Sequence, residues 1–123
     1  MSQILIIYTG GTIGMMSDPV TKTLVPINFE QLMDNVPELE KLNCKIKVHS
    51  FEHIIDSSNM NPQIWAELAA LIEANYNEVD GFVILHGSDT MAFTASALSF
   101  MLQNLDKPVI FTGSQLPISA VRT

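Results

Sequence analysis

Four runs rich in apolar residues alternate along the chain with longer segments of mixed polarity. Each run is short and ends in glycine or in small polar residues. Continuous apolar runs of this length are typical of strands that are buried on both faces, as in parallel sheets. The pattern therefore predicts strands at residues 4–8, 81–85 and 108–111. Residues 45–55 predict a further strand, whose apolar residues Ile46, Val48 and Phe51 partly alternate with polar ones.

Between these strands the apolar residues take the spacing of helices. Asn61 followed by proline is a strong helix start, and it predicts a helix over residues 61–76. Further helices are expected at residues 28–35 and 91–104. Residues 12–25 are polar and are expected to form a long mobile loop. The predicted buried faces of the two longer helices are Ile64, Trp65, Leu68, Leu71 and Ile72, and Met91, Ala95, Leu98, Met101, Leu102 and Leu105.

The order of these elements predicts an α/β fold. We expect a three-layer, mainly parallel, doubly wound sheet with helices on both faces. Residues 1–123 would form a single α/β domain. The last segment, residues 116–123, leaves a strand without a helix to cover it. We therefore expect the chain to be the front part of a longer protein.

Composition and charge exclude several classes of partner. The chain is 47% hydrophobic, and its six basic against thirteen acidic residues give a net charge of −7. This balance argues against nucleic acid and anionic membranes as partners, because both require clustered lysine and arginine. No apolar run approaches the length of a membrane span. The single cysteine, Cys44, cannot form an internal disulfide. The default expectation is a cytoplasmic protein.

Small polar residues follow every predicted strand. Because the carboxyl ends of parallel strands meet at one edge of a sheet, four segments would bring polar groups to one crevice, where ligands bind. Ordinary turn chemistry is the better explanation for any one segment, but four segments in succession favour a site. The residues concerned are Thr9 and Thr12, then Asp56, Ser57 and Ser58, then Ser88 and Asp89, then Thr112, Ser114 and Gln115.

The candidate chemistry at these strand ends is that of a hydroxyl nucleophile. The glycines after the first strand do not fit the dinucleotide fingerprint, and the chain has no phosphate-binding loop and no zinc-ligand spacing. Thr12 and Ser88 both stand beside glycines, but a hydroxyl needs an adjacent base. The nearby candidate, His86, is more often a hydrogen-bonded core residue in such a position. Asp89 could orient a base, bind an ammonium group, or serve as a helix N-cap.

The motifs at these positions resemble those of a known family. TGGTIG at residues 9–14 closely resembles the first signature of the bacterial-type asparaginase/glutaminase family, and HGSDTM at residues 86–91 resembles the second. DSS at residues 56–58 and TGSQLP at residues 112–117 also match, in the same order and spacing. The sequence is more similar to the cytoplasmic type I L-asparaginases than to the secreted type II enzymes.

This resemblance implies hydrolysis of the side-chain amide of L-asparagine, with L-glutamine as a second candidate substrate, without a metal or organic cofactor. Thr12 would be the nucleophile that forms an acyl-enzyme, and Ser88 the second catalytic hydroxyl. Asp89 would bind the substrate ammonium group and take part in catalysis. The segment at residues 14–25 would be a closing lid. The implied substrate-binding residues are Asp56, Ser57, Ser58, Ser88 and Asp89.

The sequence also departs from the family pattern. Ser88 stands where the family has threonine, Asn59 where aspartate is common, and Leu24 where many members carry a lid tyrosine. The family's catalytic lysine and second domain lie beyond residue 123. The resemblance therefore implies the incomplete N-terminal catalytic domain of a two-domain protein, which is a homodimer or homotetramer at full length. The chain alone is expected to be nearly inactive.

Two alternative functions remain open at this stage. The same signatures occur in the amidase subunit of tRNA-dependent amidotransferases, although the acidic charge of this chain gives no footprint for RNA. The other alternative is a non-catalytic module that binds an amino acid.

Overall fold

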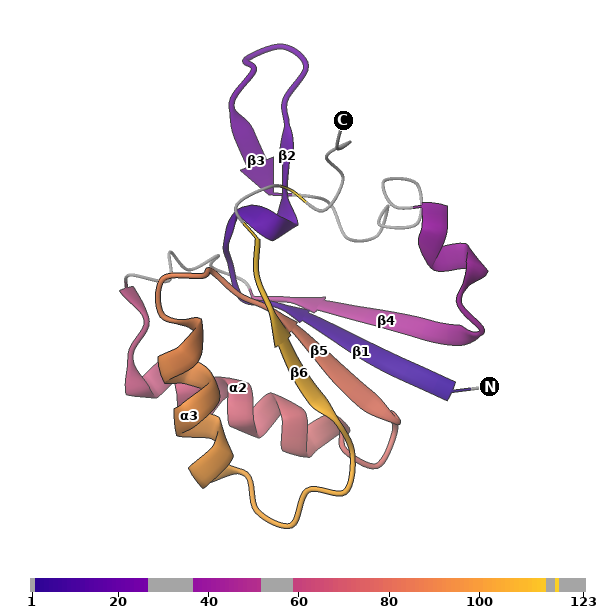
Figure 1. The fold of residues 1–123 in the computed structure, drawn as a ribbon, viewed down its shortest axis with the longest axis vertical. Coiled ribbons are helices and arrows are strands. Elements are labelled where there is room, and N and C mark those ends of the chain that lie inside the picture. Colours follow the sequence, from indigo (N-terminus) through magenta and orange to yellow (C-terminus); the bar gives the residue numbers. More distant parts are fainter. Residues whose placement is uncertain (1, 27–36, 52–58, 115–116, 118–123) are drawn as a thin grey trace.

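Four parallel strands form the central sheet of the protein. The structure, a computed structural model, describes residues 2–26, 37–51, 59–114 and 117. The strands lie in the spatial order β4-β1-β5-β6 (Figure 1). All four predicted strands are present. The strand predicted over residues 45–55 ends at Ser50, and residues 52–55 of that prediction lie outside the described residues. Their bounds are β1 Ser2–Tyr8, β4 Cys44–Ser50, β5 Gly81–Leu85 and β6 Val109–Thr112.

Alternating residues of the two central strands divide the core into two parts. In β1, Leu5 and Ile7 belong to one cluster of buried side chains, and Ile6 and Tyr8 belong to another. Side chains of a strand point to opposite faces in turn, so the two clusters lie on opposite faces of the sheet. The strand is apolar on both sides because both of its faces are covered.

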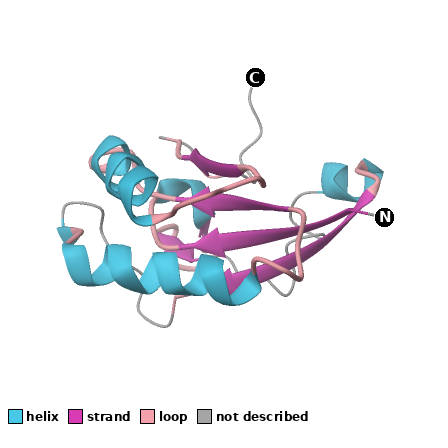
Figure 2. Ribbon diagram, turned by 90° about the horizontal axis from the view of Figure 1, so that it is seen from below, coloured by secondary structure: helices cyan, strands magenta, loops and turns pink. Residues whose placement is uncertain are grey.

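Two α-helices pack against the first of these faces. The helix α2 (Pro62–Asn75) begins where the sequence predicts, since the side chain of Asn61 accepts a hydrogen bond from the backbone N–H of Ile64 at 3.1 Å. The helix α3 (Met91–Met101) contributes Leu98 to the same cluster. Figure 2 shows the two helices beside the strands.

The second of these helices ends earlier than predicted. Its C-cap, Leu102, takes an extended conformation, and Asn104 has a positive φ of 57°, so the chain leaves the helix axis and turns toward β6. The prediction that Met101 and Leu105 are buried was wrong: they are 39% and 43% exposed. The helical spacing fails for Leu105 because the chain is no longer helical there.

The opposite face carries described parts of the connection from β1 to β4. Two short 3-10 helices, η1 (Thr12–Gly14) and η3 (Pro37–Lys41), contribute Ile13 and Leu39 to the second cluster. The connections thus run over both faces, as in doubly wound folds, and the mainly parallel sheet with helices is confirmed. The helix predicted at residues 28–35 lies outside the described residues.

Part of the predicted loop at residues 12–25 is an antiparallel hairpin. Its strands are β2 (Met15–Ser17) and β3 (Leu24–Pro26), and it stands out from the body of the molecule (Figure 1). The turn is held locally, because the carboxylate of Asp18 accepts hydrogen bonds from the backbone N–H groups of Val20 and Thr21 at 2.8 and 3.2 Å. Because of these hydrogen bonds, the segment predicted as a mobile loop contains a defined turn.

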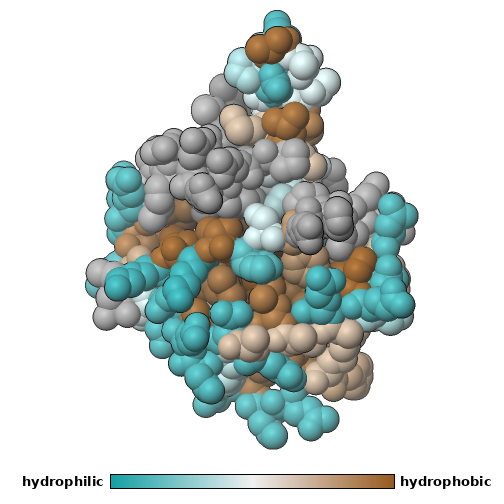
Figure 3. Space-filling view, turned by 180° about the vertical axis from the view of Figure 1, so that it is seen from behind, coloured by the Kyte–Doolittle hydropathy of each residue, from teal (hydrophilic) through white to brown (hydrophobic). Residues whose placement is uncertain are grey.

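One face of the molecule exposes both apolar and hydrophilic side chains. Seen from behind the view of Figure 1, apolar side chains are visible in the middle of the face between hydrophilic ones (Figure 3). Within the described parts of the chain, no helix has the length and apolar character needed to cross a bilayer.

Candidate active site

The four parallel strands end in register at one edge of the sheet. Tyr8, the last residue of β1, pairs with Ser50 of β4 and with Leu85 of β5, and Leu85 pairs with Thr112 of β6. The segments that follow these residues therefore start from one row. The chain runs from β1 to one side and from β5 to the other, so the boundary between them is the topological switch point, where doubly wound folds bind ligands.

Two glycines bring the loops after β1 and β5 into direct contact. A Cβ atom added to Gly11 would lie 2.7 Å from both the Cα and the N atom of Gly87, so only glycine permits this approach. Thr12 and Ser88 each come one residue later. Because consecutive Cα atoms are about 3.8 Å apart, their Cα atoms lie within about 12 Å of one another.

The loop after β6 joins the same place. A Cβ atom added to Gly113 would lie 2.6 Å from the carbonyl oxygen of His86 and 3.7 Å from the backbone nitrogen of Ser88. The backbone N–H of His86 also donates to the carbonyl oxygen of Thr112 at 3.0 Å. Three of the four predicted polar strand ends therefore meet, as the parallel sheet requires.

The predicted site residues differ in exposure. Thr12 is half-buried, whereas Ser88 and Asp89 are exposed. The N-cap of α3 is Thr90, which makes no side-chain capping bond. Asp89 is therefore not the N-cap. The prediction that Asp56, Ser57 and Ser58 belong to the site falls outside the described residues.

Thr9 has a structural place instead of a place in the crevice. It is buried, and its hydroxyl donates to the carbonyl oxygen of Leu85 at 2.9 Å. The backbone N–H of Thr9 donates to the same oxygen at 3.0 Å. These two bonds hold the ends of β1 and β5 together just before the glycine contact.

The core interpretation of His86 is confirmed. The side chain is fully buried, with Nδ1 2.7 Å from the carbonyl oxygen of Gly87 and Nε2 2.9 Å from the Thr94 hydroxyl. Since a carbonyl only accepts, Nδ1 carries the proton and Nε2 accepts from Thr94 in the neutral ring. The Thr94 hydroxyl in turn accepts from Trp65 Nε1 at 2.9 Å. This chain of bonds ties α2 and α3 to the loop that carries Ser88.

The position of His86 predicts a pH dependence of stability. Burial lowers the pKa of His86 below its ordinary value of 6.5, and the hydrogen bond to Gly87 only partly opposes this. As the pH falls, His86 takes up a proton in the unfolded chain before it does so in the folded chain. The contribution of the neutral side chain to the free energy of unfolding is therefore fully present above about pH 6.5, and it is lost as the pH falls toward the lower pKa of the folded state. Urea unfolding between about pH 7.5 and about pH 5.5 should show this loss.

A His86→Gln variant is the control for this prediction. Its stability should change less than that of the parent protein over the same pH interval, whatever its absolute stability. An equal loss in both proteins would contradict the assignment.

Sequence reasoning did not find the parts played by Trp65 and Thr94. Thr94 is the one fully buried threonine of α3, and it stands among Met91, Ala95 and Leu98 on the face that packs against the sheet. A polar residue within an apolar stripe was the available signal, because a buried hydroxyl needs a partner. The partner itself, Trp65, is 29 positions away and depends on how the two helices pack.

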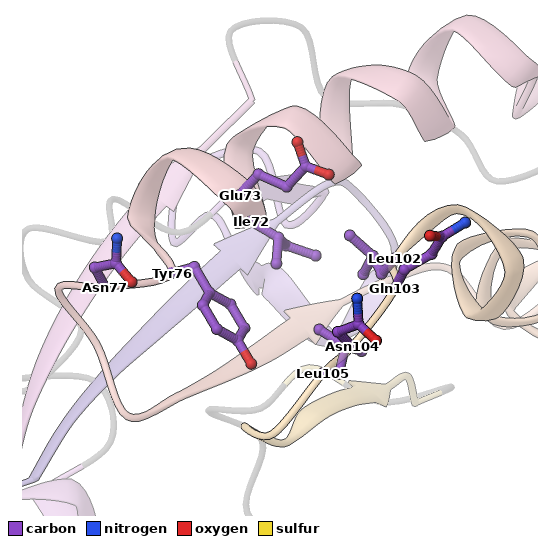
Figure 4. A pocket seen from close by; sticks show the side chains of 8 residues that line it. All are labelled: Ile72, Glu73, Tyr76, Asn77, Leu102, Gln103, Asn104 and Leu105. Carbon is purple, nitrogen blue, oxygen red and sulfur yellow. The ribbon is translucent and has the colours of Figure 1, made fainter.

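A separate pocket lies at the other end of the sheet. It has a volume of about 240 Å³ and is bounded by the end of α2 and the segment after α3 (Figure 4). None of the predicted site residues lines it. Its lining side chains are Ile72, Glu73, Tyr76, Asn77, Leu102, Gln103, Asn104 and Leu105. Across the described residues, no group of three histidine, cysteine, aspartate or glutamate side chains could hold a metal ion.

Comparison with known proteins agrees with the sheet and with the motifs at its edge. Residues 3–123 match the family described as "Asparaginase, N-terminal". The chain is 46% identical to L-asparaginase 1 of Escherichia coli (strain K12) over 121 residues, which cover 98% of this chain and 36% of that protein. The crystal structure of L-asparaginase I from Vibrio cholerae O1 biovar eltor has a TM-score of 0.85 and 47% identity, and covers 98% of this chain and 36% of that one.

A third similar protein is the probable cytoplasmic L-asparaginase from Campylobacter jejuni. Its crystal structure has a TM-score of 0.76 and 37% identity, and covers 98% of this chain and 38% of that one. The fold and the glycine contact thus define a doubly wound α/β protein with hydroxyl side chains at its switch point. The chain belongs to the asparaginase family and matches its N-terminal domain. It spans between about a quarter and about a third of the length of the curated relatives it matches.

Proposed function

We propose that this chain is the N-terminal catalytic part of an L-asparaginase, a longer protein that hydrolyses the side-chain amide of L-asparagine to L-aspartate and ammonia. The observation that carries this proposal is the contact between Gly11 and Gly87 at the switch point. It supports a crevice in which Thr12 and the Ser88–Asp89 pair face one small substrate.

Thr12 is the proposed nucleophile. Its hydroxyl oxygen attacks the side-chain carbonyl carbon, the bond from that carbon to the amide nitrogen breaks, and ammonia leaves with the hydroxyl proton. Water then attacks the resulting ester, which releases L-aspartate and restores the hydroxyl. A threonine hydroxyl is weak at neutral pH, so both steps require a neighbouring base.

The acidic residues and hydroxyls around this crevice are the proposed substrate-binding groups. Asp89 pairs with the substrate ammonium group, and the exposed Ser88 supplies a second hydroxyl near the reacting amide. Asp56, Ser57 and Ser58 complete the contacts to the α-amino and α-carboxylate groups. A charge-assisted hydrogen bond to each of these groups gives orientation as well as affinity.

His86 is not available as the general base. His86 cannot move to Thr12, because it is enclosed and both of its ring nitrogens have partners. We therefore propose that the base is a lysine in the longer protein, and that the hairpin of β2 and β3 closes over the substrate. The absence of a tyrosine at Leu24, which is 52% exposed, leaves that lid without the hydroxyl that the family resemblance implies.

Ammonia release distinguishes this proposal from its alternatives. The full-length protein is expected to release ammonia from L-asparagine in buffer alone, whereas the rate of ammonia release by residues 1–123 should be lower by about a hundredfold or more, because general base catalysis is lost. Rapid turnover by residues 1–123 would contradict the missing base. A requirement for charged tRNA would favour an amidotransferase subunit, and binding without turnover at any length would favour an amino-acid-binding module.

The setting of the enzyme is part of the same proposal. We propose that the enzyme is cytoplasmic, as the name of the similar Campylobacter jejuni protein, a probable cytoplasmic L-asparaginase, suggests for that protein. We also propose that it is a homodimer or homotetramer. Light scattering of the full-length protein would test the oligomeric state.

A further inference from the structure

The side chain of Tyr8 lies beneath the loop that carries Thr12. Tyr8 is the last residue of β1 and is fully buried. Its hydroxyl donates a hydrogen bond to the carbonyl oxygen of Gly11 at 2.9 Å. That carbonyl belongs to the peptide group that joins Gly11 to Thr12, so the bond acts on the backbone directly before the proposed nucleophile.

The ring of Tyr8 is held in place by Gly14. A Cβ atom added to Gly14 would lie 2.3 Å from Cε1 and 2.5 Å from Cζ of the tyrosine ring, which shows that the ring packs directly on the glycine backbone. Contacts at this distance permit no larger residue without moving the ring. The loop from Gly11 to Gly14 is therefore wrapped around one aromatic side chain.

The peptide before Thr12 needs such support. Gly11 has φ 97° and ψ 160°, a conformation that is essentially limited to glycine, and glycine restricts its own backbone less than any other residue. The Gly11 carbonyl also accepts from the backbone N–H of Gly14, at the longer distance of 3.3 Å. The tyrosine hydroxyl supplies the shorter of these two bonds.

We propose that Tyr8 is a positioning residue for the nucleophile. By holding the Gly11 carbonyl, it fixes the plane of the Gly11–Thr12 peptide and hence the direction in which the Thr12 hydroxyl faces the substrate. This inference rests on the proposed function. A misdirected nucleophile lowers the rate of attack more than it weakens binding, because orientation matters most in the transition state.

Burial also keeps this donor in its working form. The pKa of Tyr8 is raised to about 12 by burial, so the hydroxyl remains protonated over the whole range in which an amidohydrolase would be assayed. The support therefore does not change with pH.

The test compares two tyrosines in the full-length enzyme. The Tyr8→Phe variant removes one hydroxyl and keeps the ring that packs on Gly14. We expect kcat for L-asparagine to fall about tenfold, equivalent to about 1.4 kcal/mol, with KM changed by less than about twofold. The matched control is Tyr76→Phe, because the Tyr76 hydroxyl bonds to Asp106 and the residue lines the pocket at the other end of the sheet. It should leave kcat unchanged.

A second variant reaches the same contact from the other side. Gly14→Ala would push the ring away from Gly11, and we expect it to lower kcat in the same selective way. Unchanged kcat in both variants, with an active parent enzyme and an inactive Thr12→Ala variant, would overturn the role of Tyr8. A parent enzyme that releases no ammonia from L-asparagine would instead overturn the proposed function. If Tyr8→Phe does not fold, the Gly14→Ala variant decides alone.

Discussion

Replacing Thr12 with alanine in the full-length protein is expected to reduce ammonia release from L-asparagine by about a thousandfold or more, because it removes the atom that forms the acyl-enzyme. Thr12 is half-buried, and its neighbourhood is built from backbone contacts of glycine, so the loss of a hydroxyl and a methyl group should change the unfolding midpoint little. The measurement is the initial rate of ammonia release at saturating substrate.

Two variants control for this prediction. Thr12→Ser keeps the hydroxyl and should retain measurable activity, which separates the loss of the nucleophile from the loss of a methyl group. Ser99→Ala removes the hydroxyl of an exposed residue of α3 that belongs to no part of the proposed site, and should leave the rate within about threefold. Normal turnover by Thr12→Ala would end the assignment of the nucleophile.

The second large effect is expected from Gly11→Ala. The added Cβ would meet the backbone of Gly87 at 2.7 Å, and φ of 97° is strained for any residue with a side chain. Because backbone atoms on both sides must move, we expect the free energy of unfolding to fall by about 3 kcal/mol, together with the loss of activity. Urea unfolding and the ammonia assay measure the two effects.

Gly81→Ala is the matched control for this substitution. Its Cβ would meet the Pro108 side chain at 3.2 Å and the Ile4 side chain at 3.3 Å, and Gly81 lies at the start of β5, away from the crevice. The cost should be smaller, because side chains can adjust by a few tenths of an ångström. Equal stability of Gly11→Ala and the parent protein would mean that the two loops do not touch in solution.

The sheet could be predicted from the sequence because its physics is local. The central strands β1 and β5 are short apolar runs that are mostly buried, whereas the edge strand β4 alternates apolar and charged residues. Asn61 before Pro62 specifies the start of α2 without help from other elements. The order of strands and helices then limits the topology to a parallel sheet. The same reasoning placed four polar strand ends at one edge, and the three that fall within the described residues meet there.

The features that were not predicted depend on local side-chain hydrogen bonds, which leave no periodic pattern in the sequence, or on contacts between distant parts of the chain. The turn between β2 and β3 is held by the carboxylate of Asp18. The polar composition of this segment predicted a loop, because composition does not show such a local hydrogen bond. The bond from Trp65 to Thr94 exists only once α2 and α3 are packed. The place of Tyr8 beneath Gly11 depends equally on how the chain turns after β1. The roles of Thr12, Ser88 and Asp89 stay predictions.

The most direct test of the central claim is a crystal structure of the full-length protein with bound L-aspartate. We expect the ligand at the carboxyl edge of the sheet, with its side-chain carboxylate within hydrogen-bond distance of the Thr12 hydroxyl and its ammonium group beside Asp89. Binding of L-aspartate elsewhere, for example in the pocket that Tyr76 lines, and not beside Thr12 and Asp89, would contradict the account.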